Sequence, residues 1–231
     1  MQLFYTPNIL NGFARFDEEE SRHLLTVLRR QPGDHLRLSD GKGYFYETEL
    51  TEVGKKQAVA RILSSIAAPA ERPARLHIAI APTKQIERFE WFLEKATEIG
   101  VDTITPLHCR RSERDTIRHD RLEKVLVSAM KQSLRAYLPV LNPLTPFNKF
   151  ISIIREDQKR IAWCDTEPMP HLKESLQKGI DTVILIGPEG DFSPEEVQMA
   201  LQNGFSAISL GSARLRTETA GLLSVAVFNL L

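Results

Sequence analysis

The sequence predicts a two-domain α/β protein, in which a small β-barrel domain precedes a larger domain built on a parallel sheet. Three observations support this fold class. Short strand-like segments joined by turns fill residues 1–65. A stretch rich in Ala and Pro interrupts the periodic patterns at residues 67–74. After that stretch, short apolar runs alternate with amphipathic segments, which is typical of parallel strands connected by helices.

The first 65 residues indicate a hairpin, a third strand and one helix. HLRLSD (35–40) and YFYETEL (44–50) flank the turn residues GKG, which is a hairpin signal. QAVARILSSI (57–66) alternates partly like a strand. Between residues 17 and 30, leucines recur at helical spacing until a Pro-Gly pair ends the pattern.

The Ala- and Pro-rich stretch AAPAERPA (67–74) is typical of a linker because it lacks periodic apolar residues. We therefore expect a barrel domain over residues 1–68 and a second domain over residues 73–231. The length of 231 residues is sufficient for two domains that each bury a core.

The second domain is predicted to alternate strands and helices along its whole length. The predicted strands are residues 76–81, 101–107, 160–165, 181–187 and 207–211. The predicted helices are residues 84–100, 121–134, 171–179, 193–204 and 219–231. The helix at 193–204 has a capping-box start and the helix at 84–100 ends at a glycine. For residues 139–160 the sequence predicts neither a helix nor a strand.

The composition excludes several classes of protein. Lys+Arg 30 and Asp+Glu 30 give a formal net charge of zero, so only local clusters can indicate a polyanionic partner. Cys109 and Cys164 have neither disulfide nor metal-site spacing, and the six histidines show no ligand spacing, so we predict no metal. We expect a cytoplasmic protein because no secretory signal or long apolar stretch occurs.

Two glycine-containing loops are predicted to meet at one edge of the parallel sheet. GPEGDF (187–192) connects a strand to a helix, and Gly211 ends the next strand. Ligands usually bind where parallel strands end, so residues 186–190 and 210–220 could form one site. The sequence has no GxGxxG or GxxxxGK[ST] pattern, so a dinucleotide site or a P-loop is not expected. A tight turn without a ligand is the alternative for GPEG.

The same loops resemble the motifs of a known family. The matching segments are IGPEG at 186–190, SLG with RLRTETA between 209 and 220, RHLLTVLR at 22–29, EKATEIGVDTITPL at 94–107 and QSLRAYLP at 132–139. They look like the signature of the RsmE family, which are uridine-N3 methyltransferases of small-subunit ribosomal RNA in the SPOUT superfamily. The family usually has a glycine where this sequence has Asp191, a residue type that tolerates left-handed conformations.

The resemblance implies a fold, a cofactor and partners. The C-terminal domain would be a SPOUT-like parallel-sheet domain with a trefoil knot, and the N-terminal domain a PUA-like β-barrel that binds RNA. The protein would act as a homodimer on 16S ribosomal RNA in the small subunit. The knotted loops would bind S-adenosyl-L-methionine through Leu185, Ile186, Gly187, Pro188, Glu189, Gly190, Leu210, Gly211, Leu215, Arg216, Thr217 and Thr219.

Methylating N3 of uridine requires that the imide lose its proton and that charge on the uracil oxygens be stabilised. Arg216 and Glu218 are the catalytic candidates, Arg216 to orient or stabilise the uracil and Glu218 to position it or accept a proton. The alternative is that the two side chains pair with each other and only shape the loop. Glu189 could also be structural, by accepting bonds from backbone amides of the second loop.

Arginine clusters are the candidates for contacting RNA phosphates. Those at 110–114 follow a predicted strand, at the expected edge of the site, and those of the barrel domain lie within its predicted helical stretch. Arg135 matches the Q-S-x-R pattern of the family that the sequence resembles. The candidates are Arg22, Arg29, Arg30, Arg110, Arg111, Arg114 and Arg135. A solvated helix face is the usual alternative for such charge runs.

Two other functions are compatible with the sequence. The protein could bind RNA without catalysis, although the intact GPEG and RLRTETA segments favour an enzyme. It could also methylate another RNA site, such as a ribose 2′-hydroxyl in transfer RNA.

Overall fold

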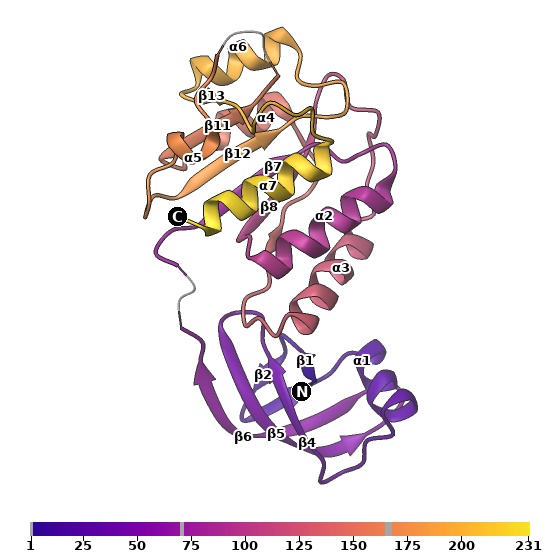
Figure 1. Cartoon of the computed structure of the whole chain (residues 1–231). Coiled ribbons are helices and arrows are strands. Elements are labelled where there is room, and N and C mark those ends of the chain that lie inside the picture. Colours follow the sequence, from indigo (N-terminus) through magenta and orange to yellow (C-terminus); the bar gives the residue numbers. More distant parts are fainter. Residues whose placement is uncertain (1, 70–71, 165–167) are drawn as a thin grey trace. The chain divides into compact units, whose positions relative to one another are not determined.

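The computed structural model of the protein describes residues 2–69, 72–164 and 168–231 (Figure 1). The described chain divides into two compact units. One contains residues up to 69 together with Val127–Leu138, and the other contains residues 72–126 and Pro139–Leu231. The expected linker 67–74 includes residues 70 and 71, and the expected strand 160–165 includes residue 165. These positions lie outside the described residues.

The first unit is a six-stranded sheet in the order β1-β4-β5-β6-β3-β2. Its strands are β1 (Leu3–Tyr5), β2 (Ile9–Leu10), β3 (Phe13–Arg15), β4 (His35–Ser39), β5 (Tyr44–Val53) and β6 (Ala58–Ala67). The predicted hairpin is confirmed, because β4 and β5 pair in antiparallel fashion on either side of GKG. Gly41 and Gly43 have φ values of 72° and 98°, a conformation that favours glycine.

The single helix expected between residues 17 and 30 is shorter and changes its type. Helix α1 (Glu18–Arg22) begins at Asp17, whose side chain accepts a bond from the Glu20 amide at 2.8 Å. It continues as a π-helical turn, η1 (His23–Val27). Leu24 on this turn is fully buried in the core of the unit.

Residues 127–138, which were expected in the second domain, belong to the first unit. The carbonyl of Ala136 accepts bonds from the Ser39 hydroxyl at 3.1 Å and from the Gly43 amide at 3.0 Å. The Lys131 ammonium lies 2.7 Å from a carboxylate oxygen of Glu20. These contacts join segments that are distant in sequence, which local patterns do not reveal.

The second unit contains a parallel sheet in the order β10-β8-β7-β12-β11-β13, with β9 also paired to β8. Its strands are β7 (Leu76–Ile80), β8 (Thr103–His108), β9 (Val140–Leu141), β10 (Thr145–Pro146), β11 (Gln158–Ala162), β12 (Thr182–Ile186) and β13 (Ser206–Ile208). The five predicted strands of this domain are thus confirmed. β7 and β12 are buried throughout, as expected for central strands of such a sheet.

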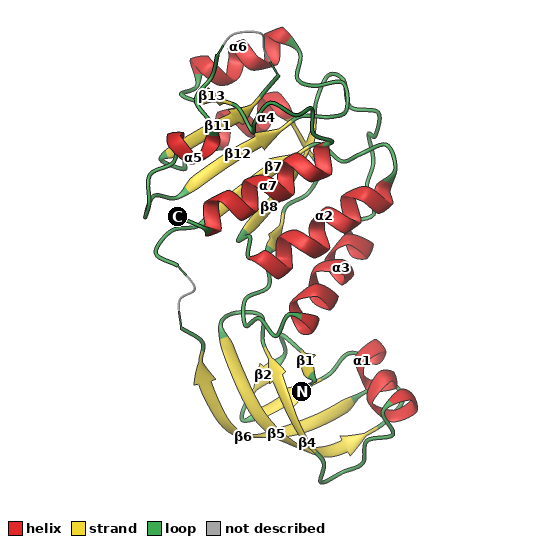
Figure 2. Cartoon of the chain, viewed as in Figure 1, coloured by secondary structure: helices red, strands yellow, loops and turns green. Residues whose placement is uncertain are grey.

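Helices cover both faces of this sheet (Figure 2). The helices of this unit are α2 (Ile86–Ile99), α4 (Phe147–Ile153), α5 (Leu172–Ser175), α6 (Pro194–Gln202) and α7 (Thr217–Asn229). Helix α3 (His119–Gln132) begins in this unit, and its residues from Val127 belong to the first unit. α7 packs against α2 and lies across β7 and β12, and α4 packs against α6. Gly221 permits the close approach of α7, because a Cβ there would lie 2.8 Å from both Ile80 and Phe92.

Two segments differ from their prediction. The helix expected at 171–179 forms only over Leu172–Ser175. The Arg160 guanidinium binds the Ser175 carbonyl, and the Gln158 side chain accepts a bond from the Gln177 amide at 2.8 Å, so tertiary contacts replace helical ones. The segment 139–160, which predicted nothing regular, contains two short strands and α4.

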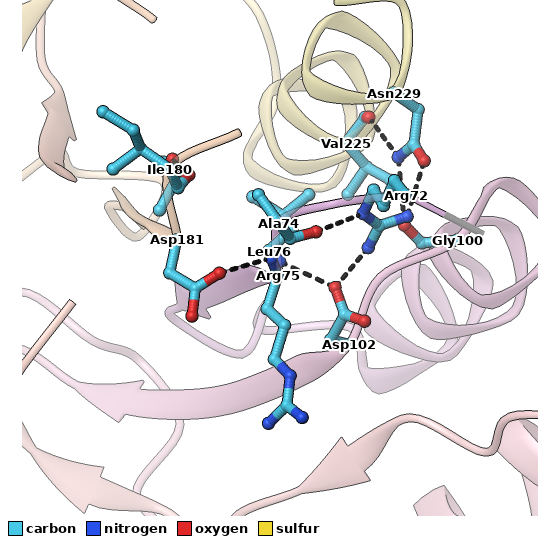
Figure 3. A network of polar contacts seen from close by, with 11 residues as sticks. Arg72, Ala74, Arg75, Leu76, Gly100, Asp102, Ile180, Asp181, Val225 and Asn229 are labelled. Carbon is cyan, nitrogen blue, oxygen red and sulfur yellow. Dashed lines mark hydrogen bonds and ion pairs between the residues drawn. The ribbon is translucent and has the colours of Figure 1, made fainter. Parts of the chain in front are cut away.

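A polar network at the amino end of β7 anchors the last turn of α7 (Figure 3). Arg72 donates to the Asn229 side-chain oxygen at 2.7 Å and forms an ion pair with Asp102. The Asn229 amide group in turn donates to the Gly100 carbonyl at 2.9 Å. The network therefore joins the entry to β7, the turn after α2 and the end of α7.

Candidate active site

Four strands of the parallel sheet end in one row. Ile186 pairs with Ile80 on one side and with Ala162 on the other, and Ala162 also pairs with Ile208. Because the strands are parallel, the loops that follow these four residues leave the sheet at the same edge. The loops after β12 and β13 thus open on one edge, as expected, although β11 lies between their strands.

These loops surround a cavity of about 930 Å³. This is the size range of pockets that bind small molecules and cofactors. The lining residues are 162–164, 168, 169, 171, 186–189, 191, 208–218, 220 and Arg88 of α2.

The β12–α6 loop (187–193) is held in a single shape by its own hydrogen bonds. The Pro188 carbonyl accepts a bond from the Asp191 amide at 2.9 Å, which closes a tight turn. Asp191 has φ 63°, and its carboxylate accepts bonds from the amides of Phe192 at 2.8 Å and Cys164 at 3.2 Å. An aspartate therefore adopts the left-handed conformation here. Gly187 is needed for close packing, because a Cβ there would lie 3.2 Å from the Phe192 nitrogen.

Neighbouring loops brace the β12–α6 loop from outside. The Glu189 carboxylate accepts a bond from the Lys84 amide at 2.9 Å. Arg111 donates to the carbonyls of Gly190 at 2.9 Å and Phe192 at 3.3 Å. Glu189 therefore has a structural role, but its partner belongs to the loop after β7 and not to the loop after β13.

The β13–α7 loop (209–216) has few internal bonds. The Ser209 hydroxyl accepts a bond from the Gly211 amide at 3.1 Å, and Gly211 has φ 116°. The Thr217 hydroxyl donates to the Gly187 carbonyl at 3.0 Å, which connects the two loops. For the N–H groups of residues 212–216, no hydrogen-bond partner exists among the described residues. These residues line the cavity.

Arg216 and Glu218 both line the cavity. Arg216 is the exposed N-cap residue of α7, and Glu218 lies in its first turn with 8 % of its surface exposed. Within residues 2–69, 72–164 and 168–231, neither side chain has a hydrogen-bonding or ionic partner, so they do not pair with each other.

Most of the residues expected to bind a cofactor line the cavity, and three do not. Leu185 is fully buried in the core below the cavity. Gly190 lies outside the lining with its carbonyl bound to Arg111. Thr219 is exposed on α7 and is also absent from the lining.

The larger domain's predicted RNA-binding arginines form bonds within the protein. Arg114 donates to the carbonyls of Thr83 at 3.1 Å and Lys84 at 2.6 Å. Arg110 lies 3.0 Å from a carboxylate oxygen of Glu195, in an exposed ion pair. Together with Arg111, these side chains fix loops around the cavity. Their binding to RNA stays a prediction.

The remaining predicted RNA-binding arginines belong to the first unit. Arg22 pairs with Glu18 at 2.7 Å, and Arg30 lies 3.7 Å from Asp34. Arg29 is exposed, with φ 54°. Arg135 is half-buried. None of these residues lines the cavity, and their role in RNA binding also stays a prediction.

Sequence patterns did not predict the part of the cavity lining that follows β11. Trp163, Cys164, Pro168, Met169 and His171 line the cavity because β11 lies between β12 and β13. The strand order decides this arrangement, and the order is set by contacts between distant segments. Arg88 was missed as well, because it lies in the first turn of an otherwise ordinary amphipathic helix.

Other kinds of site are not indicated in the described part of the chain. There, no group of three or more His, Cys, Asp or Glu side chains is arranged to hold a metal ion. Burial raises the pKa of the Cys109 thiol, which disfavours a thiolate nucleophile there. No helix among the described residues is long and apolar enough to cross a membrane.

Comparisons with known proteins agree on one family. A family model described as an RNA methyltransferase domain matches residues 70–229, and one described as an RNA methyltransferase PUA domain matches residues 16–63. The chain is 30 % identical to a protein of Synechocystis sp. named ribosomal RNA small subunit methyltransferase E, over 96 % of this chain and 75 % of that one.

Solved structures support the same relationship. A probable rRNA-methyltransferase from Porphyromonas gingivalis is 43 % identical, with a TM-score of 0.90, over 98 % of this chain and 96 % of that one. The ribosomal RNA small subunit methyltransferase E from Neisseria gonorrhoeae, solved with bound S-adenosyl methionine, is 30 % identical. Its TM-score is 0.83, over 98 % of this chain and 95 % of that one.

Proposed function

The chain belongs to the RsmE family of ribosomal RNA small subunit methyltransferases, and we propose that it methylates N3 of a specific uridine in 16S ribosomal RNA with S-adenosyl-L-methionine as the donor. One observation carries the assignment to this cavity. Glu218 and Arg216, which have no partner among the described residues, line a cofactor-sized cavity where four parallel strands end.

The residues of the cavity fit the proposed donor. Apolar side chains, including Trp163, Met169 and Leu215, offer contact area for a flat, partly apolar molecule. The N–H groups of residues 212–216 can bind polar atoms, since they have no partner among the described residues. We infer that the β12–α6 and β13–α7 loops hold the donor between them. When bound, S-adenosyl-L-methionine supplies the methyl group.

The proposed roles of the chain's own residues follow from the chemistry of uridine. The N3 imide must lose a proton, and Glu218 is the lining carboxylate without a partner in the described chain that can accept it. Negative charge then develops on the uracil oxygens, which the Arg216 guanidinium can stabilise. Thr217 lies between these two residues and fixes their backbone through its bond to Gly187.

Three further properties form part of this proposal. We propose that the chain is knotted where residues 209–216 cross from β13, at the edge of the sheet, to α7, which lies across β7 and β12. We propose that the first unit binds RNA, which its match to a PUA-domain model supports. We also propose a cytoplasmic homodimer, whose subunit number sedimentation equilibrium would measure.

Nucleoside analysis after methylation tests the reaction. Unmodified small-subunit particles would be incubated with the protein and labelled donor, and the RNA digested and analysed by mass spectrometry. We expect 3-methyluridine, and none with Glu218→Gln. A 2′-O-methylated nucleoside would overturn the assignment to N3. Absence of any methylated nucleoside, with donor binding intact, would overturn the proposed substrate.

A further inference from the structure

Arg88 is the one guanidinium that α2 contributes to the cavity lining in the described chain. It is half-buried. No hydrogen bond or ion pair of its side chain occurs among residues 2–69, 72–164 and 168–231. In the described chain none of its side-chain nitrogens is buried without a partner, so the guanidinium is accessible and can bind a ligand.

The position of Arg88 in its helix strengthens this point. α2 begins after its N-cap residue Gln85, so Arg88 lies in the first turn. There the helix dipole and the N–H groups present positive charge, which disfavours a second cation. The guanidinium and the helix start would both favour an oxyanion at this point.

The backbone that carries Arg88 is firmly fixed. In the loop before α2, the Lys84 amide donates to the Glu189 carboxylate. The carbonyls of Thr83 and Lys84 accept bonds from the Arg114 guanidinium. The Thr83 hydroxyl also donates to the Gln85 carbonyl at 2.6 Å. The backbone of the first turn of α2 is therefore fixed before a ligand binds, while the guanidinium of Arg88 has no partner among the described residues.

The charged side chains that line the cavity balance in formal charge, with three arginines and three carboxylates, but they differ in their hydrogen-bond partners. Among the acidic lining residues, Glu189 and Asp191 already accept backbone bonds, and Glu218 accepts none in the described chain. Among the basic ones, the side chains of Arg88, Arg214 and Arg216 have no partner among the described residues. Three guanidinium groups and one carboxylate of the lining are thus left without a hydrogen-bond partner in the described chain.

We propose that Arg88 binds an oxyanion of the target nucleotide during methylation, and this rests on the proposed function. The oxyanion is either a uracil carbonyl oxygen, as the imide loses its proton, or a phosphate next to the target. Both are planar or tetrahedral oxygen groups that a guanidinium fork recognises. Arg88 is therefore a substrate-contacting residue that α2, and not the β12–α6 or β13–α7 loop, contributes to the cavity lining.

The test compares Arg88→Gln and Arg88→Lys with wild type. Arg155→Gln, an exposed arginine in the turn before β11, is the control for loss of one positive charge. Donor affinity by calorimetry should be unchanged in all variants. We expect kcat/KM for small-subunit particles to fall on the order of 100-fold in Arg88→Gln, with partial recovery in Arg88→Lys and no change in Arg155→Gln.

Two measurements distinguish the sources of the oxyanion. If Arg88 contacts the uracil, its loss should lower kcat and move the rise of kcat with pH to higher pH, because the imide anion is less stabilised. If it contacts a phosphate, RNA affinity should weaken and the salt dependence of binding should decrease by about one counterion, while the pH profile stays unchanged.

Other outcomes would overturn the proposal. Wild-type kcat/KM in Arg88→Gln would show that no substrate contact exists. Loss of donor affinity in Arg88→Gln, of the same size as its loss of kcat/KM, would assign Arg88 to the donor instead. If wild type does not methylate the particles, the proposed function fails separately, and RNA affinity of the Arg88 variants in the presence of donor still decides whether Arg88 binds the RNA.

Discussion

The two loops that form the candidate site are built in opposite ways. The β12–α6 loop closes its own turn and is bound from outside by Lys84 and Arg111. The β13–α7 loop has five consecutive N–H groups without a partner in the described chain, and Thr217 connects it to the first loop. The first loop is prepared before a ligand arrives, whereas the second has donors that only a ligand or water can satisfy.

This difference indicates how binding energy is used. A loop that already has its bound conformation loses little conformational entropy on binding, so its contacts with the ligand contribute directly to affinity. A loop with free donors gains its bonds on binding and becomes ordered in the same step. We expect hydrogen exchange of residues 209–216 to slow when donor is added, and that of residues 187–193 to change little.

The largest effect is expected from Gly187→Ala. The added Cβ would lie 3.2 Å from the backbone nitrogen of Phe192 and 3.2 Å from the buried ring of the same residue, so the β12–α6 loop must shift. We expect donor affinity to fall on the order of 100-fold, because small displacements of positioning groups are costly. Gly190→Ala is the matched control, since its Cβ would meet Arg111 at an ordinary 3.4 Å. Calorimetric titration would measure both, and equal losses would contradict this account.

A smaller effect is expected from breaking the link between the loops. Thr217→Val keeps the shape of the side chain but leaves the buried Gly187 carbonyl without its donor. An unsatisfied buried acceptor costs about 1–3 kcal/mol, so we expect about tenfold weaker donor binding. Thr217→Ser retains the hydroxyl and should bind nearly as wild type. If valine and serine behave alike, the link is not what couples the loops.

Substitutions of Asp191 distinguish the contribution of backbone conformation from that of hydrogen bonding in the β12–α6 loop. Asp191→Gly removes the bonds to Phe192 and Cys164 but suits φ 63°, whereas Asp191→Ala removes the bonds and adds strain. The strain should make the alanine variant about 1 kcal/mol less stable than the glycine variant. Chemical unfolding would measure this difference, and equal stability would show that the left-handed conformation is not strained.

The smallest effect is expected from Arg111→Ala. Arg111 is exposed at the point where it donates to Gly190, so water can replace its bonds in part. We expect donor affinity to fall about threefold, within the net energy of one exposed hydrogen bond. The salt dependence of RNA binding tests the other role predicted for this residue. A decrease of about one counterion, without a change in donor affinity, would assign Arg111 to RNA and not to bracing.

Local signals in the sequence predicted those parts of the fold that depend on neighbouring residues. The start of α6 is an example, because Ser193 and Glu196 form the capping box within four residues. The end of α2 at Gly100, with φ 116°, is another. The left-handed Asp191 also follows from a property of its own side chain.

The features of the fold and of the cavity that local signals did not predict depend on the order of the strands in the sheet. β12 pairs with β7 across more than a hundred residues, and β11 separates β12 from β13. Neither pairing leaves a local pattern, so the wall after β11 was not predicted. The same reason applies to Arg110, Arg111 and Arg114. Their spacing is that of a charged surface run, while their partners lie on other loops.

Helix α7 is fastened at both ends, at Thr217 beside the cavity and at Asn229 in the network around Arg72. A helix that is free at one end frays from that end, and its amides exchange by local opening. Here either end opens only when a tertiary bond breaks. The amides of α7 should therefore exchange together with those of β7 and α2, which α7 covers. We expect the side of the cavity that α7 forms to share the global stability of its domain, in contrast to the β13–α7 loop.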